Sequence, residues 1–591
     1  MRMTGKVKNK NKKKSQAAAV WRRLKKNKMA VLGLIILAVI IFFAVFADVF
    51  FDYETLVIQQ NASLKLQPPS VEHWLGTDEV GRDILARIVH GARISLPVAF
   101  ATIAIATVVG GLLGAIAGYG SRRVDDVIMR VMDIFLAIPS ILLSIALTLE
   151  EKAGLCSGAD FWHTKTVERL GIPTMMVSDG PHGLRTQDPE RDDPNHSRKA
   201  VCFPAGCSVA ASFDPDLARR EGAAIGREAR AFGVGVVLGP AINIKRSPLC
   251  GRNFEYYSED PVLAGELAAG YINGVQSQGV GTSIKHFAAN SQEYRRMSAS
   301  SDMTERTLRE IYLPAFETAV KKSQPWTVMC SYNRVNDVFA SENRMLLTDI
   351  LRTEWNFKGF VMSDWGAVAD RVKGVAAGLD LEMPGSGGVN DAKIVAAVKA
   401  GTLSEAALDK AVIRILNIVF RAADEAAAPA PELDLKGDHT IAAELAKECA
   451  VLLQNRGVLP LKKGSKVVYI GGFAKTPRYQ GGGSSHIHPS RVTSAWEVAQ
   501  QKGRNVCYAK GFSAMRDEMT DAELAEAIQA AQNADVAVVF AGLPESFESE
   551  GYDRTSMELP ACQNRLIDEI AKVQPHVVVV LHNGSAVELP W

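Results

Sequence analysis

The 591-residue sequence lacks the cysteine patterns that mark a metal site or a disulfide framework. Its eight cysteines are scattered, form no CxxC pair and do not combine with histidine at zinc-ligand spacing. In a chain of this length, such cysteines are typical of buried free thiols. We expect the protein to need neither a metal nor an organic cofactor.

Strong net charge is also missing. The formal net charge is +2 and 47% of the residues are hydrophobic, which excludes the compositions typical of nucleic-acid-binding proteins and of acidic disordered proteins. The length suggests three or four domains. We therefore expect a globular chain of several domains that does not bind nucleic acid.

The N-terminal quarter has its own character. The first 28 residues contain many Lys and Arg and no acidic residue, and three apolar segments follow, at Met29–Ala47, Ile94–Gly120 and Ile134–Leu149. These lengths predict about three transmembrane helices, with buried soluble helices as the alternative. The basic N-terminus and Arg122–Arg123 favour a cytoplasmic location for those segments. Three spans then place the rest of the chain on the other side of the membrane.

Two stretches of this region resemble a known family of membrane proteins. His73–Leu96 and Gly114–Leu147 are similar to the permease subunit of bacterial dipeptide/oligopeptide ABC transporters. The resemblance implies a multi-pass protein of a bacterial inner membrane over residues 1–147, with ABC transporter subunits as its usual partners. Such permeases have about six spans and a cytoplasmic loop that couples them to the ATPase. The sequence contains no such loop, so we do not expect transport by this chain alone.

Beyond residue 147, segments with strand and helix patterns alternate. Polar residues follow each of the predicted strands, which are Pro173–Val177, Val234–Leu238, Gly281–Ile284, Thr327–Met329 and Gly359–Met362. Helical patterns lie between them, at Pro215–Ala231, Pro261–Gln278 and Thr304–Lys322. This order predicts a TIM-type (β/α)8 barrel over residues 148–421, because chemistry in such barrels gathers at the carboxyl ends of the strands. A doubly wound sheet is the alternative.

A second α/β domain is predicted after the barrel. Ala422–Glu432 has the alanine, proline and acid content of a semi-rigid spacer, so we assign residues 422–435 to a linker. A helix is predicted at Ile441–Gln454, and buried strands at Lys466–Gly471, Asp535–Gly542 and Pro575–Leu581. Residues 436–591 are therefore expected to form an open α/β sandwich.

Six polar residues at the predicted strand ends form the candidate site: Asp179, Arg252, Lys285, His286, Tyr332 and Asp364. Each has an ordinary structural reading on its own, such as a surface pair of Arg252 with Glu255 or a core position for His286. Together they have no metal-ligand spacing, and they combine a carboxylate with cations and hydrogen-bond donors. A carboxylate held ionised by Arg and Lys is suited to attack an anomeric carbon, and the other groups are suited to bind sugar hydroxyls.

The motifs around these residues resemble glycoside hydrolase family 3, the two-domain β-glucosidases. The resemblance runs from about Thr148 to Trp591 and rests on SDGPHGLR, GRNFEYYSEDP, KHFAAN, MCSYNRVN, GFVMSDWGA, PRYQGGGSSHIHP and ESEGYDR. Members that release N-acetylglucosamine carry a catalytic histidine in the loop after the KHF motif. The loop AANSQEYRRM here has none, which favours the glucosidase branch.

The resemblance also assigns roles to individual residues. Asp364 is expected to be the nucleophile, and Asp179, Arg252, Lys285 and His286 are expected to bind the non-reducing-end sugar. Tyr332 is expected beside the nucleophile, and Trp365 as an aromatic wall for the aglycone. The acid/base is expected on a loop of the second domain, at Glu550, with Glu548 left open as the alternative.

The predicted function is therefore retaining hydrolysis of terminal β-linked glucose, or a related sugar, from small glucosides or oligosaccharides. The hydrolase part is expected outside the inner membrane, or in the cytoplasm if the N-terminal segment is not native to it. Members of the family continue past the LPW motif that ends here, so the second domain is expected to be incomplete. A peptide-transporter permease subunit and an inactive chimera are the alternative readings.

Overall fold

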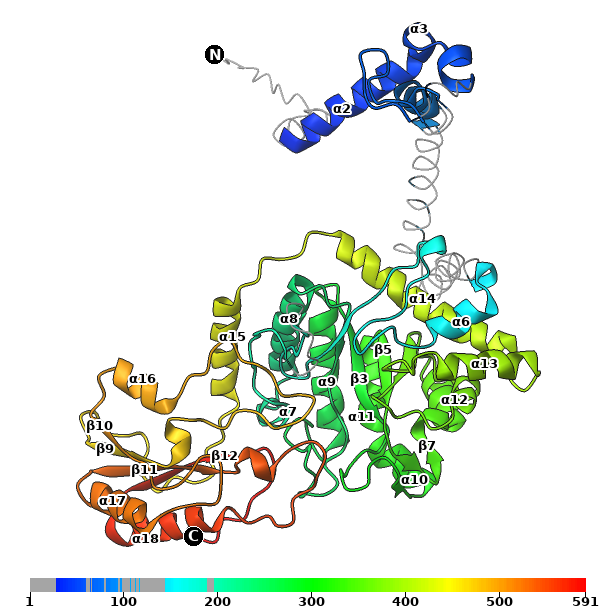
Figure 1. Cartoon of the computed structure of the whole chain (residues 1–591). Helices are drawn as coiled ribbons and strands as arrows, with labels where there is room; N and C mark the ends of the chain where they lie inside the picture. The colour runs from blue at the N-terminus through cyan, green and yellow to red at the C-terminus, as the bar shows by residue number, and fades with distance from the viewer. Residues whose placement is uncertain are drawn as a thin grey trace, which may run out of the picture. The chain divides into compact units, whose positions relative to one another are not determined.

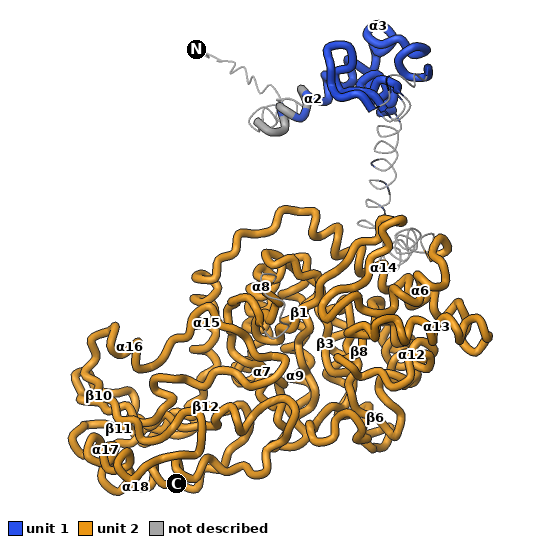
Figure 2. The backbone as a smooth tube through the Cα atoms, viewed as in Figure 1, with its two compact units in different colours: residues 1–136 blue, residues 137–591 orange. Residues whose placement is uncertain are grey.

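The computed structural model describes residues 28–59, 64, 66–78, 81–93, 96–97, 107, 112, 116, 144–188 and 196–591. Two compact units divide the chain, residues 1–136 and residues 137–591 (Figure 2). The first unit contains helix α2 (Lys28–Val45), helix α3 (Ala47–Phe50) and the π-helical turn η1 (Tyr53–Ile58).

The first predicted membrane segment, Met29–Ala47, coincides with α2 and the start of α3. The other two, Ile94–Gly120 and Ile134–Leu149, lie largely outside the described residues. Within the ranges that the structure describes, no helix combines the length and the apolar character needed to cross a bilayer.

The larger unit begins with an α/β barrel-like domain, as predicted. Its five-stranded sheet has the order β1-β2-β3-β5-β8, and every pair of neighbours is parallel. The strands are β1 (Val177–Asp179), β2 (Val236–Leu238), β3 (Gly281–Phe287), β5 (Thr327–Cys330) and β8 (Phe360–Ser363). Single parallel bridges, Met362 to Leu381 and Ser157 to Glu382, extend the sheet beyond β8. All strands therefore end at the same edge.

Helices surround this sheet (Figure 1). They are α6 (Leu149–Leu155), α7 (Gly206–Ala210), α8 (Pro215–Ala231), α9 (Pro261–Gln276), α10 (Glu305–Thr307), η4 (Leu308–Tyr312), α11 (Pro314–Ser323), η6 (Met345–Glu354), α12 (Arg371–Ala377), α13 (Val389–Lys399) and α14 (Glu405–Ala427). A small three-stranded sheet, β4 (Ser300–Ser301), β6 (Arg334–Val335) and β7 (Val338–Phe339), lies in the loops.

The packing of α8 against α9 follows directly from their sequences. Each helix begins with an Asp-Pro pair, in which Asp214 or Asp260 accepts a hydrogen bond from a backbone N–H of the first turn. Gly222 faces the α9 backbone so closely that a Cβ there would lie 2.3 Å from the carbonyl oxygen of Tyr271. The glycine lets the two helix backbones approach closely. The apolar side chains of both helices are buried in one core with residues of the strands.

The second domain contains a four-stranded parallel sheet with the order β10-β9-β11-β12. Its elements are α15 (Leu435–Glu448), β9 (Val467–Ile470), α16 (Ala495–Gln501), β10 (Val506–Ala509), α17 (Asp521–Gln532), β11 (Val536–Gly542), α18 (Ala561–Val573) and β12 (Val577–His582). Helices α17 and α18 pack side by side below the sheet in the view of Figure 1. The predicted α/β sandwich is confirmed.

Three details around the linker differ from the sequence-based expectation. Helix α14 runs into the expected spacer as far as Ala427, because the run of alanines favours helix, and stops where Ala428 precedes a proline. The next helix starts at Leu435 rather than Ile441, because Asp434 caps it by accepting a hydrogen bond from the Gly437 N–H. It ends at Glu448, six residues before the expected end at Gln454.

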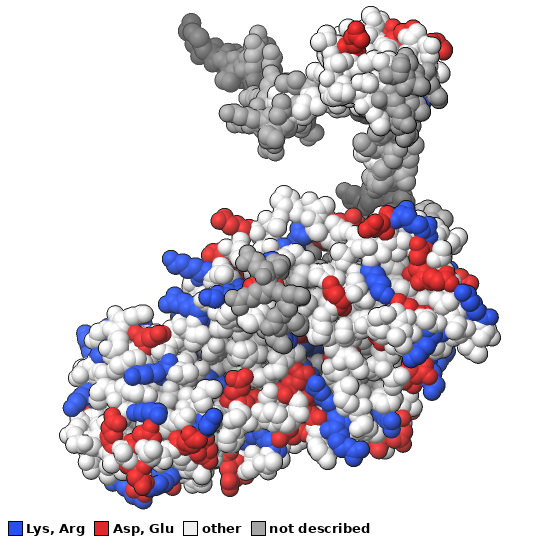
Figure 3. Space-filling view, in the orientation of Figure 1, with Lys and Arg blue, Asp and Glu red and all other residues white. Residues whose placement is uncertain are grey.

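Charged side chains of both signs are interspersed on the face of residues 137–591 that Figure 3 shows. Elsewhere on the unit, independently of this view, charged side chains form ion pairs, as in the contact between Nζ of Lys322 and Oε1 of Glu266 at 2.6 Å. This face is thus a mixed surface of the kind common on soluble domains.

Candidate active site

The parallel strands deliver the predicted site residues to one edge of the barrel sheet. Asp179 ends β1, Lys285 and His286 lie in β3, and Asp364 follows β8 directly. Tyr332 comes two residues after β5, and Arg252 comes from the loop that follows β2. Parallel strands with a common direction bring these side chains together, as expected for a barrel of this kind.

Asp364 has one carboxylate oxygen engaged and one free. Its Oδ1 accepts a hydrogen bond of 2.8 Å from the backbone N–H of Trp365. Its Oδ2 is buried, has no hydrogen-bond partner among the described residues and lies 3.6 Å from Nε2 of His286. Burial raises the pKa of Asp364 to about 6, although the nearby Arg252 and Lys285 act in the opposite direction. Because buried polar atoms normally have a hydrogen-bond partner, this unpartnered oxygen marks Asp364 as a candidate functional residue.

The position of His286 is fixed by Asn243. The side chain of Asn243 accepts a hydrogen bond of 2.8 Å from the His286 backbone N–H and donates one of 2.8 Å to the His286 carbonyl oxygen. Burial lowers the pKa of His286 well below its ordinary value, and Arg252 and Lys285 add to the effect. The imidazole is therefore neutral at neutral pH.

Asp179 lies between two cations. Its Oδ1 is 3.5 Å from Nζ of Lys285, and its Oδ2 is 3.4 Å from a guanidinium nitrogen of Arg185. Burial raises the pKa of Asp179, and the two cations act against that rise. This combination of acceptor and donors is suited to bind the hydroxyl groups of a sugar.

Glu550 enters the same site from the second domain. Its Oε1 lies 2.8 Å from Arg296 and 3.5 Å from Arg252, and its Oε2 accepts a hydrogen bond of 2.6 Å from the Ser484 N–H. Burial by itself would raise the pKa of Glu550, but the two guanidinium groups outweigh it and hold this pKa well below its ordinary range. A second carboxylate thus lies close to the residues that surround Asp364.

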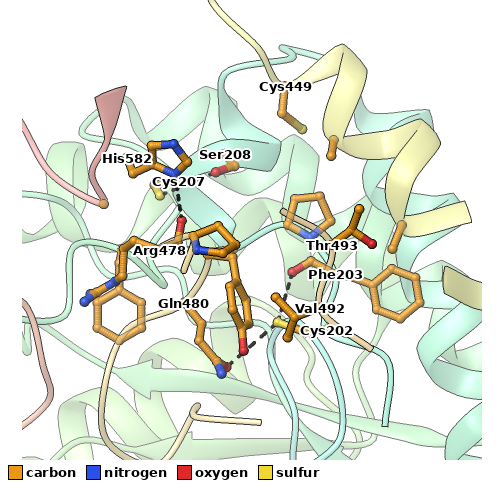
Figure 4. Close-up of a pocket in the computed structure, with 18 of the residues that line it drawn as sticks. Cys202, Phe203, Cys207, Ser208, Cys449, Arg478, Gln480, Val492, Thr493 and His582 are labelled. Carbon is orange, nitrogen blue, oxygen red and sulfur yellow. Dashed lines mark hydrogen bonds between the residues drawn. The ribbon is translucent and has the colours of Figure 1, made fainter. Parts of the chain in front are cut away.

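Glu548 lies two residues away and points elsewhere. It is buried, with Oε1 2.5 Å from the hydroxyl of Ser585 and Oε2 2.9 Å from the Gly584 backbone nitrogen. It also lines a cavity of about 570 Å³ between the two domains, together with Arg478, Gln480 and His582 (Figure 4). None of the barrel's candidate site residues lines this cavity. The structure therefore brings Glu550, and not Glu548, to the barrel site.

Aromatic side chains border the site. The indole of Trp365 donates a hydrogen bond of 3.1 Å to the carbonyl oxygen of Phe161, and its ring centroid is 5.8 Å from that of Trp162. The hydroxyl of Tyr332 donates to the Trp365 carbonyl oxygen, and the Arg296 guanidinium lies 4.5 Å from the centre of the Tyr332 ring. These contacts provide an apolar surface next to the charged centre.

Sequence reasoning missed three contributors to the site: Asn243, Arg296 and Ser484. Arg296 follows the KHFAAN motif within QEYRR, and Ser484 belongs to the GGGSS stretch, so both lie in segments already singled out. Arg296 reaches Glu550 across the domain boundary, and Ser484 reaches it from 66 residues away within the second domain, so no local pattern reveals either contact. Among the described residues, no group of three His, Cys, Asp or Glu side chains is arranged to hold a metal ion.

Comparisons with known families agree with these motifs. The glycosyl hydrolase family 3 N terminal domain matches residues 141–418, and the C-terminal domain of the same family matches residues 450–591. The N-terminal TM domain of oligopeptide transport permease C matches residues 15–69, ahead of the stretches that suggested that resemblance. Both predicted resemblances are confirmed.

Individual relatives are similar over the same region. Thermostable beta-glucosidase B of Acetivibrio thermocellus is 56% identical over 451 residues, which are 75% of this chain and 60% of that protein. A beta-glucosidase of Rhizobium radiobacter is 34% identical, and the match covers 75% of this chain and 72% of that protein. The structure of beta-glucosidase 3B from Thermotoga neapolitana in complex with alpha-D-glucose superposes with a TM-score of 0.71 at 36% identity, covering 76% of this chain and 70% of that one.

Proposed function

Because the chain belongs to glycosyl hydrolase family 3, we propose that it hydrolyses terminal β-linked glucose, or a related sugar, from small glucosides or oligosaccharides. One observation carries the proposal. Two carboxylates from different domains, Asp364 and Glu550, share a buried site with Arg252 and Lys285. The β-glucosidase names of the relatives support the same reaction class.

The reaction is proposed to proceed with retention of configuration in two steps. In the first, Asp364 attacks C1 of the sugar, a bond forms between C1 and the carboxylate, and the bond to the leaving oxygen breaks. Glu550 gives its proton to that oxygen. In the second, Glu550 takes a proton from water, the water oxygen bonds to C1, and the ester to Asp364 breaks.

The remaining residues bind and orient the substrate in this proposal. Asp179, Arg252, Lys285 and His286 bind the hydroxyls of the non-reducing-end sugar, Tyr332 supports the nucleophile, and Trp365 contacts the aglycone. Two buried atoms at this edge of the barrel support the assignment, because Nη2 of Arg252 and Oδ2 of Asp364 have no hydrogen-bond partner among the described residues.

The electrostatics of the site are consistent with the second step of the reaction. Arg252 and Arg296 keep Glu550 as a carboxylate, the form required of the base in the second step. The first step needs the protonated acid, so a proton must be taken up as substrate binds. Sugar hydroxyls that draw Arg252 away from Glu550 would raise the pKa of Glu550 and favour this uptake.

The test combines a substitution with covalent labelling. Asp364→Asn should leave the fold intact and lower turnover of aryl β-glucosides by several orders of magnitude, because the covalent nucleophile is lost. A 2-deoxy-2-fluoro-glucoside should label the peptide that contains Asp364. Asp370→Asn is the matched control, because Asp370 caps α12 through the Lys373 N–H and should keep its activity. Labelling of another carboxylate would contradict the assignment.

For the whole chain, we propose that residues 1–147 anchor the hydrolase in a bacterial inner membrane through about three helices. The family match over residues 15–69 and the basic N-terminus support an anchor. Residues 148–421 would then form a (β/α)8 barrel outside the cytoplasm, followed by the linker 422–435 and the domain 436–591. Protease accessibility in spheroplasts tests the orientation, because protection of the hydrolase part from external protease would contradict it.

A further inference from the structure

The loop that carries Glu550 is tied to the barrel by the carboxylate of Asp553. Oδ1 of Asp553 accepts hydrogen bonds from the backbone N–H groups of Gly251, at 3.0 Å, and Glu293, at 2.9 Å. Oδ2 accepts one of 2.9 Å from the N–H of Tyr294. A single side chain of the second domain therefore binds two separate barrel loops, one next to Arg252 and the other next to Arg296.

Glu293 makes the reciprocal contact from the barrel. Its side chain is buried, and Oε2 accepts a hydrogen bond of 2.8 Å from the backbone N–H of Gly551, the residue after Glu550. The same oxygen accepts one of 2.7 Å from Arg296, and Arg296 donates to Glu550 at 2.8 Å. Each loop thus binds the backbone of the other through a carboxylate, and Glu550 lies at the centre of the contact.

The fit between the two loops leaves no free space at Gly251. A Cβ on Gly251 would lie 1.8 Å from the carbonyl oxygen of Tyr552 and 2.4 Å from that of Ser549. The loop 549–554 therefore rests directly on the backbone beside Arg252. On its other side, the Glu550 N–H donates to the Gly482 carbonyl oxygen at 3.1 Å. The backbone on both sides of Glu550 is held.

We infer that Asp553 and Glu293 form an interdomain clamp that fixes Glu550 in the barrel site, so that Asp553 is a positioning residue for proton transfer. The inference rests on the proposed acid/base role of Glu550. A charged acceptor that satisfies three backbone N–H groups is stronger than neutral alternatives. Its loss lets the loop shift, and a displacement of about 1 Å in a reacting group can cost about 10²-fold in rate.

Asp553→Asn and Glu293→Gln test the clamp in the full chain. The first amide keeps the volume of the side chain but turns an NH2 group toward N–H donors. The matched control is Asp438→Asn, because Asp438 is also a buried carboxylate that joins the barrel to the segment after it, through Arg227 at 2.6 Å. Glu550→Ala belongs in the same series as the reference for a missing acid/base.

The assay compares kcat/KM for cellobiose, whose leaving group needs a proton, with that for 2,4-dinitrophenyl glucoside, whose leaving group does not. We expect Asp553→Asn and Glu293→Gln to lower the cellobiose value by about 10²-fold and to spare the dinitrophenyl substrate. The control variant Asp438→Asn should leave kcat/KM unchanged for both substrates. Hydrogen exchange at the amides of Gly251, Glu293 and Tyr294 should accelerate in Asp553→Asn.

The outcomes separate the clamp from the proposed function. Equal losses on both substrates in the two clamp variants, or no loss, would overturn the positioning role while leaving the hydrolase reading intact. If Glu550→Ala itself lowers kcat/KM equally for cellobiose and for the dinitrophenyl substrate, the acid/base assignment is refuted instead. Unchanged exchange at the three amides would show that the clamp does not exist, whatever the activity.

Discussion

The ionisation of Asp364 gives the sharpest test of the site, because its free energy can be worked from the structure. Burial moves the pKa of this carboxyl from 3.8 to about 6. That shift corresponds to about 3 kcal/mol of preference for the neutral form. Only the ionised form attacks C1, so the nucleophile becomes available as pH rises through about 6 and is lost below it.

The assay should isolate this one ionisation. Inactivation by 2,4-dinitrophenyl 2-deoxy-2-fluoro-β-glucoside needs the nucleophile but not a protonated acid, because dinitrophenolate leaves unaided. We therefore expect the second-order rate constant of inactivation to reach a plateau above a midpoint near pH 6. Below the midpoint it should fall about tenfold per pH unit, because the ionised fraction varies inversely with the proton concentration.

A substitution then checks the physical cause. Lys285 lowers the pKa of Asp364, so Lys285→Met should move the midpoint to higher pH even though it also weakens binding. Lys165→Met is the control, because Lys165 pairs with Asp391, at 2.6 Å, and should leave the midpoint unchanged. A wild-type midpoint near the ordinary value of 3.8 would refute the reasoning, since burial would then not dominate.

Two further predictions concern carboxylates elsewhere. Glu550→Ala should slow cellobiose far more than an aryl glucoside with a good leaving group and should be rescued by azide, whereas the same behaviour in Glu548→Ala alone would exchange the roles. Burial raises the pKa of Glu228 from 4.5 to about 8, so the stability tied to its proton is lost as pH rises across that range. At pH 8, Glu228→Gln should therefore raise Tm relative to the wild type and raise the free energy of unfolding by up to about 5 kcal/mol, whereas at pH 4.5 it should raise neither. An equal effect of Glu228→Gln at pH 8 and pH 4.5 would contradict the raised pKa of Glu228.

Much of the fold follows from local patterns. The starts of α8 at Pro215 and α9 at Pro261, and most of the apolar strands with polar ends, were predicted from the sequence because helix starts and short buried strands are encoded within a few residues. The start of α15 was missed, since Asp434 looked like part of a spacer until its contact with the Gly437 N–H was known. A helix start that is defined by a single capping hydrogen bond, such as this one, is hard to recognise from sequence alone.

The sequence by itself determined the family and the set of strand-end residues around Asp364, because those residues lie in contiguous motifs. Only the tertiary structure distinguished Glu550 from Glu548. Side chains two residues apart on an extended strand share a face, so periodicity cannot separate them. Their different environments arise from contacts across the chain: Glu550 meets Arg252 and Arg296 of the barrel, whereas Glu548 meets Ser585 beyond β12. Partners that are more than thirty residues away in sequence leave no local pattern, and folding alone brings them together.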